Sequence, residues 1–121
     1  MNNNIKRQGC HLIVKFPKEA DHHHLLTYDD RIKMELIKKG VKNILFDFSD
    51  VVFIDSSAIG LVLSKSKTVA SLGGKVGICN AKGHVLKVLN VCAATGVNRV
   101  FQNIKEAVDS FDNKLNIGES R

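Results

Sequence analysis

Residues 44–60 read ILFDFSDVVFIDSSAIG, in which apolar runs lead into a cluster of small polar residues. A short apolar run bounded by polar turn residues is typical of a buried strand, and Asp-Ser-Ser directly before a segment with helical periodicity is typical of a helix start. This part of the chain therefore predicts a strand, a loop and a helix that continues to about Leu72. Ser56 and Ser57 stand at the joint between loop and helix.

The carboxylate of Asp55 suits the N-cap of that helix, because it can accept a hydrogen bond from the backbone amide of Ser57 or Ala58. Steps of three and four residues place one set of small and polar residues on the face below Ser57. This stripe consists of Gly60, Ser64, Lys67 and Ser71, with Thr68 beside them. The opposite face, which we expect to dock on a sheet, carries Ala58, Ile59, Val62, Val69, Ala70 and Leu72.

The two serines allow two interpretations. Serines in a first helical turn are commonly plain capping residues. A capping serine does not need a flat stripe of small residues leading away from it, whereas a hydroxyl that another protein must reach does. The stripe therefore favours Ser57 as a hydroxyl presented to a partner.

Hydrophobic periodicity along the rest of the chain predicts alternating elements. We expect strands over about residues 5–7, 10–16, 41–48, 75–80 and 97–101, and helices over about residues 22–39, 83–94 and 104–111. Leu12, Val14 and Phe16 alternate and should face the core, and the first helix carries Leu25, Leu26, Ile32, Leu36 and Ile37. A hairpin followed by repeated helix and strand units predicts an α/β domain with a mostly parallel sheet.

Composition limits the classes of function. The 121 residues predict one domain, residues 1–121, with a core over about 5–111 and a flexible tail over 112–121. The net charge of +6 favours an acidic partner, but the basic residues are scattered and aromatics make up only 6%, so we expect no direct binding to nucleic acid. The absence of a long apolar run or signal-peptide core predicts a cytoplasmic protein without membrane contact. Cys10, Cys79 and Cys92 lack metal or disulfide spacing and are expected to be buried or half-buried.

The run from Phe48 to Gly60 resembles the signature of the STAS domain family, specifically its bacterial anti-sigma factor antagonists, which share Asp-Ser-Ser-Gly-hydrophobic-Gly after a hydrophobic strand. Residues 19–23, EADHH, look like the family's Glu-Leu-Asp-His-His, and residues 73–80, GGKVGICN, look like its next turn and strand. The chain departs from the family at Ala58, where Gly is usual, and at Pro17-Lys18.

The resemblance implies a single domain with a central mixed, mostly parallel sheet of about four or five strands and about four flanking helices. It also implies an anti-sigma factor serine kinase as the partner, which the unmodified protein binds so that the sigma factor is released. Phosphorylation of Ser57 would switch the protein off, and a serine phosphatase would restore it, in sporulation or a stress response. The implied partner-contacting residues are Asp21, His22, His23, Asp55, Ser56, Ser57, Gly60, Ser64 and Lys67.

Other chemistries match less well. A hydrolase elbow would need Gly-x-Ser-x-Gly around Ser57, which is absent, and no histidine can be assigned to it as a base, so we expect no enzyme. We expect no metal at His22-His23-His24, because adjacent side chains on a helix diverge and no carboxylate stands at ligand spacing. Residues 72–77 lack a nucleotide fingerprint, so no cofactor is expected. The alternative to the antagonist is a STAS module that senses a small ligand or nucleotide, or scaffolds a signalling complex.

Overall fold

The computed structural model describes residues 4–92 and 99–113, and a five-stranded sheet runs through them. The strands lie in the order β1-β2-β4-β6-β7, with β1 (Ile5–Gln8), β2 (His11–Lys15), β4 (Asn43–Asp47), β6 (Val76–Cys79) and β7 (Arg99–Phe101). Only β1 pairs antiparallel, with β2, while the other neighbours are parallel. The predicted mixed, mostly parallel sheet is therefore confirmed.

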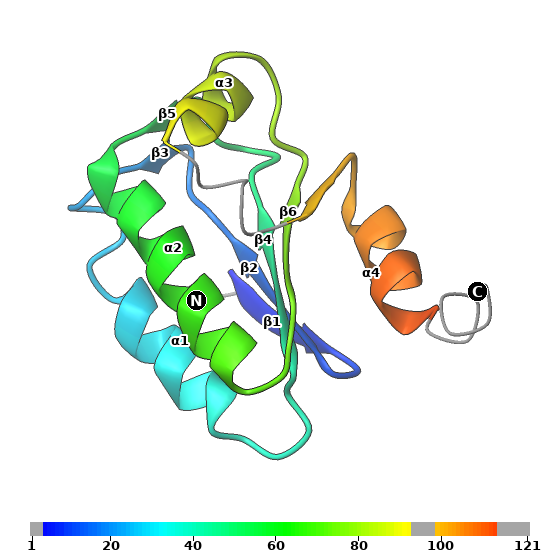
Figure 1. The fold of residues 1–121 in the computed structure, drawn as a ribbon. Coiled ribbons are helices and arrows are strands. Elements are labelled where there is room, and N and C mark those ends of the chain that lie inside the picture. The colour runs from blue at the N-terminus through cyan, green and yellow to red at the C-terminus, as the bar shows by residue number, and fades with distance from the viewer. Residues whose placement is uncertain (1–3, 93–98, 114–121) are drawn as a thin grey trace.

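Four helices accompany this sheet in the described residues: α1 (Tyr28–Leu36), α2 (Ser56–Ser71), α3 (Gly83–Val91) and α4 (Ile104–Asp112). Figure 1 shows α1 and α2 side by side on one face of the sheet and α4 on the other. Side chains of β4 alternate between the two faces, since Ile44 and Phe46 join the larger core cluster and Leu45 joins the cluster under α4. The fold is thus a sheet covered on both faces, as parallel sheets require.

Aromatic rings pack against one another within the larger core cluster, whose other members are aliphatic. The Phe16 ring lies 5.4 Å from that of Phe46 and 5.0 Å from that of Phe48, measured between ring centroids. Leu12, Val14 and Phe16 are buried as their alternation predicts. Burying side chains of this size stabilises the fold by roughly 1.5–3 kcal/mol each.

The helix predicted over residues 22–39 is wrong at both ends. Residues 21–27 form turns, α1 begins only at Tyr28, and its C-cap is Ile37. Leu26 and Ile37 lie outside the helix and are 60% and 83% exposed, so they do not share its buried face. The Asp21 side chain accepts a hydrogen bond from the His24 backbone amide, as an N-cap does, and the Leu25 amide donates to the Asp21 carbonyl. The Tyr28 amide donates to the carbonyl of Leu25, only three residues back, so this first turn does not continue as a regular helix.

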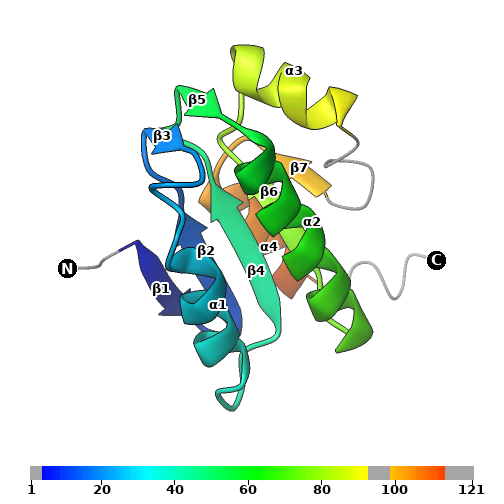
Figure 2. The same cartoon turned by 90° about the vertical axis from the view of Figure 1, so that its left-hand side faces the viewer.

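A short parallel pair that the periodicity did not predict, β3 (Glu19–Ala20) with β5 (Phe53–Ile54), lies beyond the main sheet. Figure 2 shows the pair near the start of α2. Two-residue strands carry no detectable period, which explains why the sequence pattern does not reveal them. Their pairing brings the chain after residue 20 to the start of α2.

Helix α2 agrees with the prediction over its first part and departs from it near its end. Ala58, Val62 and Val69 are buried, but Ala70 is exposed and Leu72 is 66% exposed. Ala70 is exposed because it lies roughly 80° round the helix from the buried Val62. Leu72 is exposed because it is the C-cap of the helix. The buried face instead includes Lys65, whose ammonium group lies 2.6 Å from the Asp29 carboxylate on α1.

Three other predictions concern the cysteines, the strand over residues 97–101 and the C-terminal tail. Cys79 is buried and Cys10 half-buried, but the prediction was wrong for Cys92, which is exposed because it lies at the C-cap of α3. All three thiols are free. The predicted strand over 97–101 is found from Arg99, and residues 97–98 lie outside the described residues, as does the predicted tail from residue 114. Asp112, assigned to that tail by pattern, belongs to α4.

Candidate functional site

The joint between β5 and α2 is held by the side chain of Asp55. The residue has an extended backbone, and its Oδ1 accepts hydrogen bonds from the amides of Ser57 at 2.8 Å and Ala58 at 3.4 Å. The Ala58 amide also contacts the Asp55 carbonyl oxygen at 3.2 Å, whereas the carboxylate is the one acceptor that the described residues offer the Ser57 amide, which would otherwise need water. The predicted N-cap is confirmed.

The second oxygen of Asp55 reaches the preceding turn. Its Oδ2 accepts a hydrogen bond from the backbone amide of His22 at 3.0 Å, and the Asp55 amide donates to the carbonyl of Ala20 at 3.3 Å. One carboxylate therefore joins the 21–27 turn to the head of α2. Two predicted site segments, Asp21 to His23 and Asp55 to Ser57, meet here although they are more than thirty residues apart.

The two serines differ in exposure. Ser56 is exposed and Ser57 is half-buried, and the Ser57 hydroxyl makes no hydrogen bond to any described residue. Below them Gly60, Ser64 and Lys67 are all exposed on the outer face of α2. Apart from its chain neighbours and the adjacent helix backbone, a Cβ built at Gly60 meets no described heavy atom within 4 Å, so packing against the described residues does not require glycine there. Its effect is to keep the stripe flat.

Ala58, the departure from the family pattern, is fully buried. Its methyl group belongs to the core cluster that α2 forms with the sheet, and it does not add to the surface around Ser57. The extra Cβ therefore fills the core.

The 21–27 turn contributes exposed imidazoles and one carboxylate. His22 and His23 are exposed, and Asp21 is half-buried. Hydrogen bonds from the backbone amide and then the ring of His24 hold the pKa of the Asp21 carboxyl below its ordinary value. This carboxylate is therefore ionised at neutral pH and constrains the turn.

The expectation that no carboxylate stands at ligand spacing from the three histidines is wrong for His24. Asp21 Oδ1 lies 2.7 Å from His24 Nδ1, and Glu19 Oε1 lies 3.9 Å from His24 Nε2. The reason is that these residues are not helical, so consecutive side chains do not follow the helical spacing on which the expectation rested. No histidine ring in residues 4–92 or 99–113 forms a hydrogen bond with the Ser57 hydroxyl.

A polar network at the opposite end of the sheet was not found from the sequence. The Lys75 amide donates to Asn43 Oδ1 at 2.8 Å, Asn43 Nδ2 lies 3.2 Å from His11 Nδ1, and His11 Nε2 lies 2.8 Å from Asp112 Oδ1. Because the Lys75 amide fixes the amide orientation, Asn43 donates to His11, which in turn donates to Asp112. The network joins α4 to the sheet, and its members, 101 residues apart at the extremes, carry no shared sequence signal.

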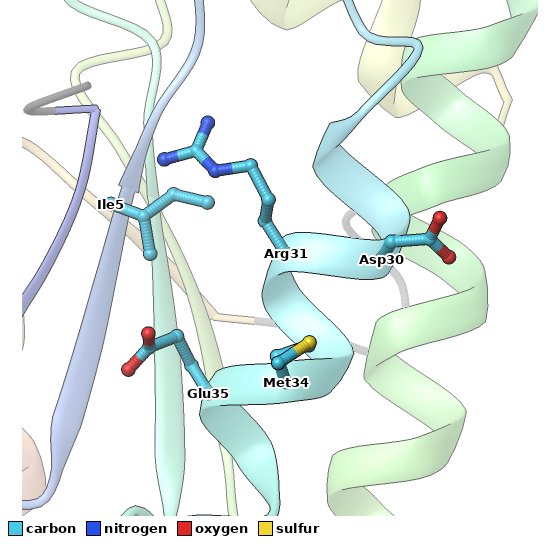
Figure 3. Close-up of a pocket in the computed structure, with 5 residues that line it drawn as sticks. All are labelled: Ile5, Asp30, Arg31, Met34 and Glu35. Atoms are coloured by element: carbon cyan, nitrogen blue, oxygen red, sulfur yellow. The ribbon is translucent and has the colours of Figure 1, made fainter. Parts of the chain in front are cut away.

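A surface groove of about 400 Å³ lies between β1 and α1. Its lining residues are Ile5, Asp30, Arg31, Met34 and Glu35. Figure 3 shows Arg31 and Glu35 extending from α1 toward Ile5. None of the predicted partner-contacting residues lines this groove, whereas Lys67 borders a smaller hollow of about 150 Å³ on α2.

The fold and the Asp-Ser-Ser joint define a protein class. Residues 2–107 match the model of the STAS domain, so the chain belongs to the STAS domain family. The chain is similar to an anti-sigma F factor antagonist from Paenibacillus polymyxa, with 23% identity over 105 residues that cover 84% of this chain and 86% of the relative.

Two solved structures of SpoIIAA share the fold. The anti-sigma factor antagonist SpoIIAA in its unphosphorylated form aligns with a TM-score of 0.74 and 22% identity, covering 90% of this chain and 96% of that one. The Bacillus cell fate determinant SpoIIAA in its phosphorylated form aligns with a TM-score of 0.70 and 21% identity, covering 88% of this chain and 96% of that one.

Among the described residues, no helix is both long and apolar enough to span a bilayer.

Proposed function

We propose that this STAS domain is an anti-sigma factor antagonist whose binding to an anti-sigma factor serine kinase is switched by a phosphate on Ser57. The observation that carries the proposal is the geometry at the start of α2. The Ser57 amide is held by Asp55, its hydroxyl is free of hydrogen bonds to described residues, and exposed Gly60, Ser64 and Lys67 continue the same face. The names of the relatives support the same role.

A phosphate on Ser57 would change the surface more than the fold. It would add about −1.5 to −2 charge at neutral pH in the first turn of α2, where the helix dipole favours an anion. Asp55 stands next to it and would oppose the new charge, but both groups face a partly solvated surface. We therefore expect the phosphorylated protein to keep its fold.

The partner would respond much more strongly. A protein that covers the α2 stripe must either desolvate the phosphate or leave space for it, and any carboxylate placed opposite Ser57 would repel it. Unmodified, the same surface offers small side chains and the ammonium group of Lys67, which suit close approach by an acidic partner. Attachment and removal of one anion would then select between binding and release.

The 21–27 turn would form the second part of the binding surface. Asp21, His22 and His23 are held beside α2 by the hydrogen bond between the His22 amide and Asp55. A partner that contacts Ser56 and Ser57 would meet this turn as well. We therefore assign Asp21, His22, His23 and Asp55 to the partner-binding surface together with the stripe.

The test uses a cognate anti-sigma factor kinase and ATP. We expect a mass gain of one phosphate that is lost in Ser57→Ala and retained in the matched control Ser56→Ala, and reversal by a metal-dependent serine phosphatase. Ser57→Asp should lose binding to the kinase while its circular dichroism spectrum stays unchanged. Unchanged binding of Ser57→Asp, or a phosphate on Ser56, would refute the proposal.

A second candidate function, sensing of a small ligand, is favoured by the groove beside α1. Arg31 and Glu35 supply charged groups there, and Ile5 and Met34 supply apolar surface. In this case a small ligand would bind the purified protein, Arg31→Ala would weaken that binding, and the kinase would add no phosphate. Phosphorylation at Ser57 without a ligand excludes this candidate as the main function.

A further inference from the structure

A cluster of histidine and carboxylate side chains lies where the chain passes from β3 into the 21–27 turn. Glu19, Asp21 and His24 each offer one ligand atom, and these three atoms lie within 4.8 Å of one another. The side chains of Glu19 and His24 are 60% and 44% exposed, so an ion from solvent can reach them. His23 lies next to the cluster, with its ring centroid 5.1 Å from that of His24.

The contact between Asp21 and His24 determines which ring nitrogen is available. A carboxylate can only accept, so the 2.7 Å contact between Asp21 Oδ1 and His24 Nδ1 places a hydrogen on Nδ1. In the neutral ring the lone pair is then on Nε2, on the side of Glu19. Metal-binding histidines have this arrangement, with the other ring nitrogen donating to a carboxylate.

The distance between His24 Nε2 and Glu19 Oε1 is 3.9 Å, which is too long for a hydrogen bond. Two ligands at about 2.1 Å from one tetrahedral ion stand roughly 3.4 Å apart. A small rotation of the exposed Glu19 side chain therefore brings both atoms to ligand distance. The space between them suits an ion better than it suits direct contact.

We propose that Glu19 and His24 form a binding site for a divalent transition metal ion of the Zn²⁺ class, with Asp21 orienting the imidazole. An imidazole nitrogen with a carboxylate oxygen favours Zn²⁺, Ni²⁺ or Cu²⁺ over Mg²⁺ or Ca²⁺. His23 can supply a further imidazole after a side-chain rotation, and water completes the coordination. The alternative use of the cluster is a protonated His24 that forms ion pairs with both carboxylates.

Metal binding would stiffen the turn beside α2. Glu19 belongs to β3 and His24 to the 21–27 turn, so an ion that both residues bind joins the two segments. The turn is already tied to Asp55 through the His22 amide. The site does not use the Ser57 hydroxyl, so the inference stands or falls independently of the proposed function.

The test titrates Zn²⁺ into untagged, folded protein by calorimetry and follows the melting temperature at saturating Zn²⁺. We expect one ion per chain and a raised melting temperature. His24→Ala and Glu19→Gln should each weaken binding at least tenfold, and Asp21→Asn by about 10–100-fold, the usual effect of losing a partner of a ligating histidine.

Two matched variants control for other donors. His84→Ala removes an exposed histidine on α3, and Cys92→Ser removes an exposed thiol, so both should bind Zn²⁺ like the parent. Circular dichroism spectra of all variants should overlay, because each substitution lies on an exposed or half-exposed side chain. Unchanged affinity in His24→Ala or Glu19→Gln, loss of binding in Cys92→Ser, or no Zn²⁺ binding by the parent would overturn the site.

Discussion

Removing the Asp55 carboxylate should cost more stability than removing an ordinary helix cap. In Asp55→Ala the helix loses a cap, which costs about 1 kcal/mol. The His22 amide also loses a charged acceptor, and such a hydrogen bond contributes roughly 1.5–3 kcal/mol when buried. Because Asp55 is half-buried, we take the lower end and expect a total loss of about 2–3 kcal/mol.

Asn103→Ala on α4 is the matched control. Asn103 is an N-cap whose side chain accepts a single hydrogen bond, from the Glu106 amide at 2.8 Å, and it ties no second segment. We expect it to lose about 1 kcal/mol. Asp55→Asn should fall between the two alanine variants, because an amide has one acceptor oxygen where the carboxylate has two.

Urea denaturation followed by circular dichroism measures the three free energies of unfolding. For a domain of this size 1 kcal/mol corresponds to roughly 3–5 °C in melting temperature, so Asp55→Ala should melt about 6–15 °C below the parent. Hydrogen exchange at the His22 amide should accelerate in Asp55→Ala and not in Asn103→Ala. An Asp55→Ala variant that loses no more stability than Asn103→Ala would refute the claim that this carboxylate joins the turn to α2.

Asp29→Asn should lower the free energy of unfolding in urea by roughly 1–2 kcal/mol, a value reduced because the carboxylate is half-exposed. Lys65→Met should change it by less than about 1 kcal/mol, because this substitution leaves no charge buried. The Lys65 ammonium group holds the pKa of the Asp29 carboxyl below its ordinary value. The stability that this ion pair contributes is therefore present above about pH 4 and is lost as the pH falls through the lowered pKa. Asp29→Asn should flatten that part of the acid unfolding curve, and an unchanged curve would contradict the role of the ion pair. Burial raises the pKa of the Cys79 thiol to about 12. At pH 8 a maleimide should therefore label the exposed Cys92 and react with Cys79 only after unfolding, which mass spectrometry of the peptides can show. Labelling of Cys79 in the folded protein would count against its burial. Gly74→Ala should cost about 3 kcal/mol, the upper end of the usual effect of overpacking, because the new Cβ collides with the backbone carbonyl oxygen of Lys42. A melting temperature equal to that of the parent would show that the turn can move aside.

The elements that sequence reasoning found are those with a local cause. Asp55 caps α2 through amides two and three residues ahead, and the alternation of Leu12, Val14 and Phe16 follows from the geometry of a strand. The small residues of the α2 stripe follow in the same way from the helical period. Such features need no knowledge of what lies across the fold.

The start of α1 shows where local reasoning fails. The periodic apolar residues after position 22 predicted a helix, but the regular helix begins only at Tyr28, and the Asp55 carboxylate holds the His22 amide of the turn before it. This hydrogen bond spans 33 residues. A local sequence pattern contains no information about an acceptor that far along the chain.

The amino-acid sequence by itself determined the α/β class, the order of the main strands and helices, and the Asp55 cap that presents Ser57, because neighbouring residues suffice for each of these. Only the tertiary structure decided that Lys65 is buried against Asp29, that β3 pairs with β5, and that one carboxylate holds the 21–27 turn beside α2. These contacts join segments distant in the chain, and their energy depends on burial and partner geometry that exist only once the sheet has brought those segments together.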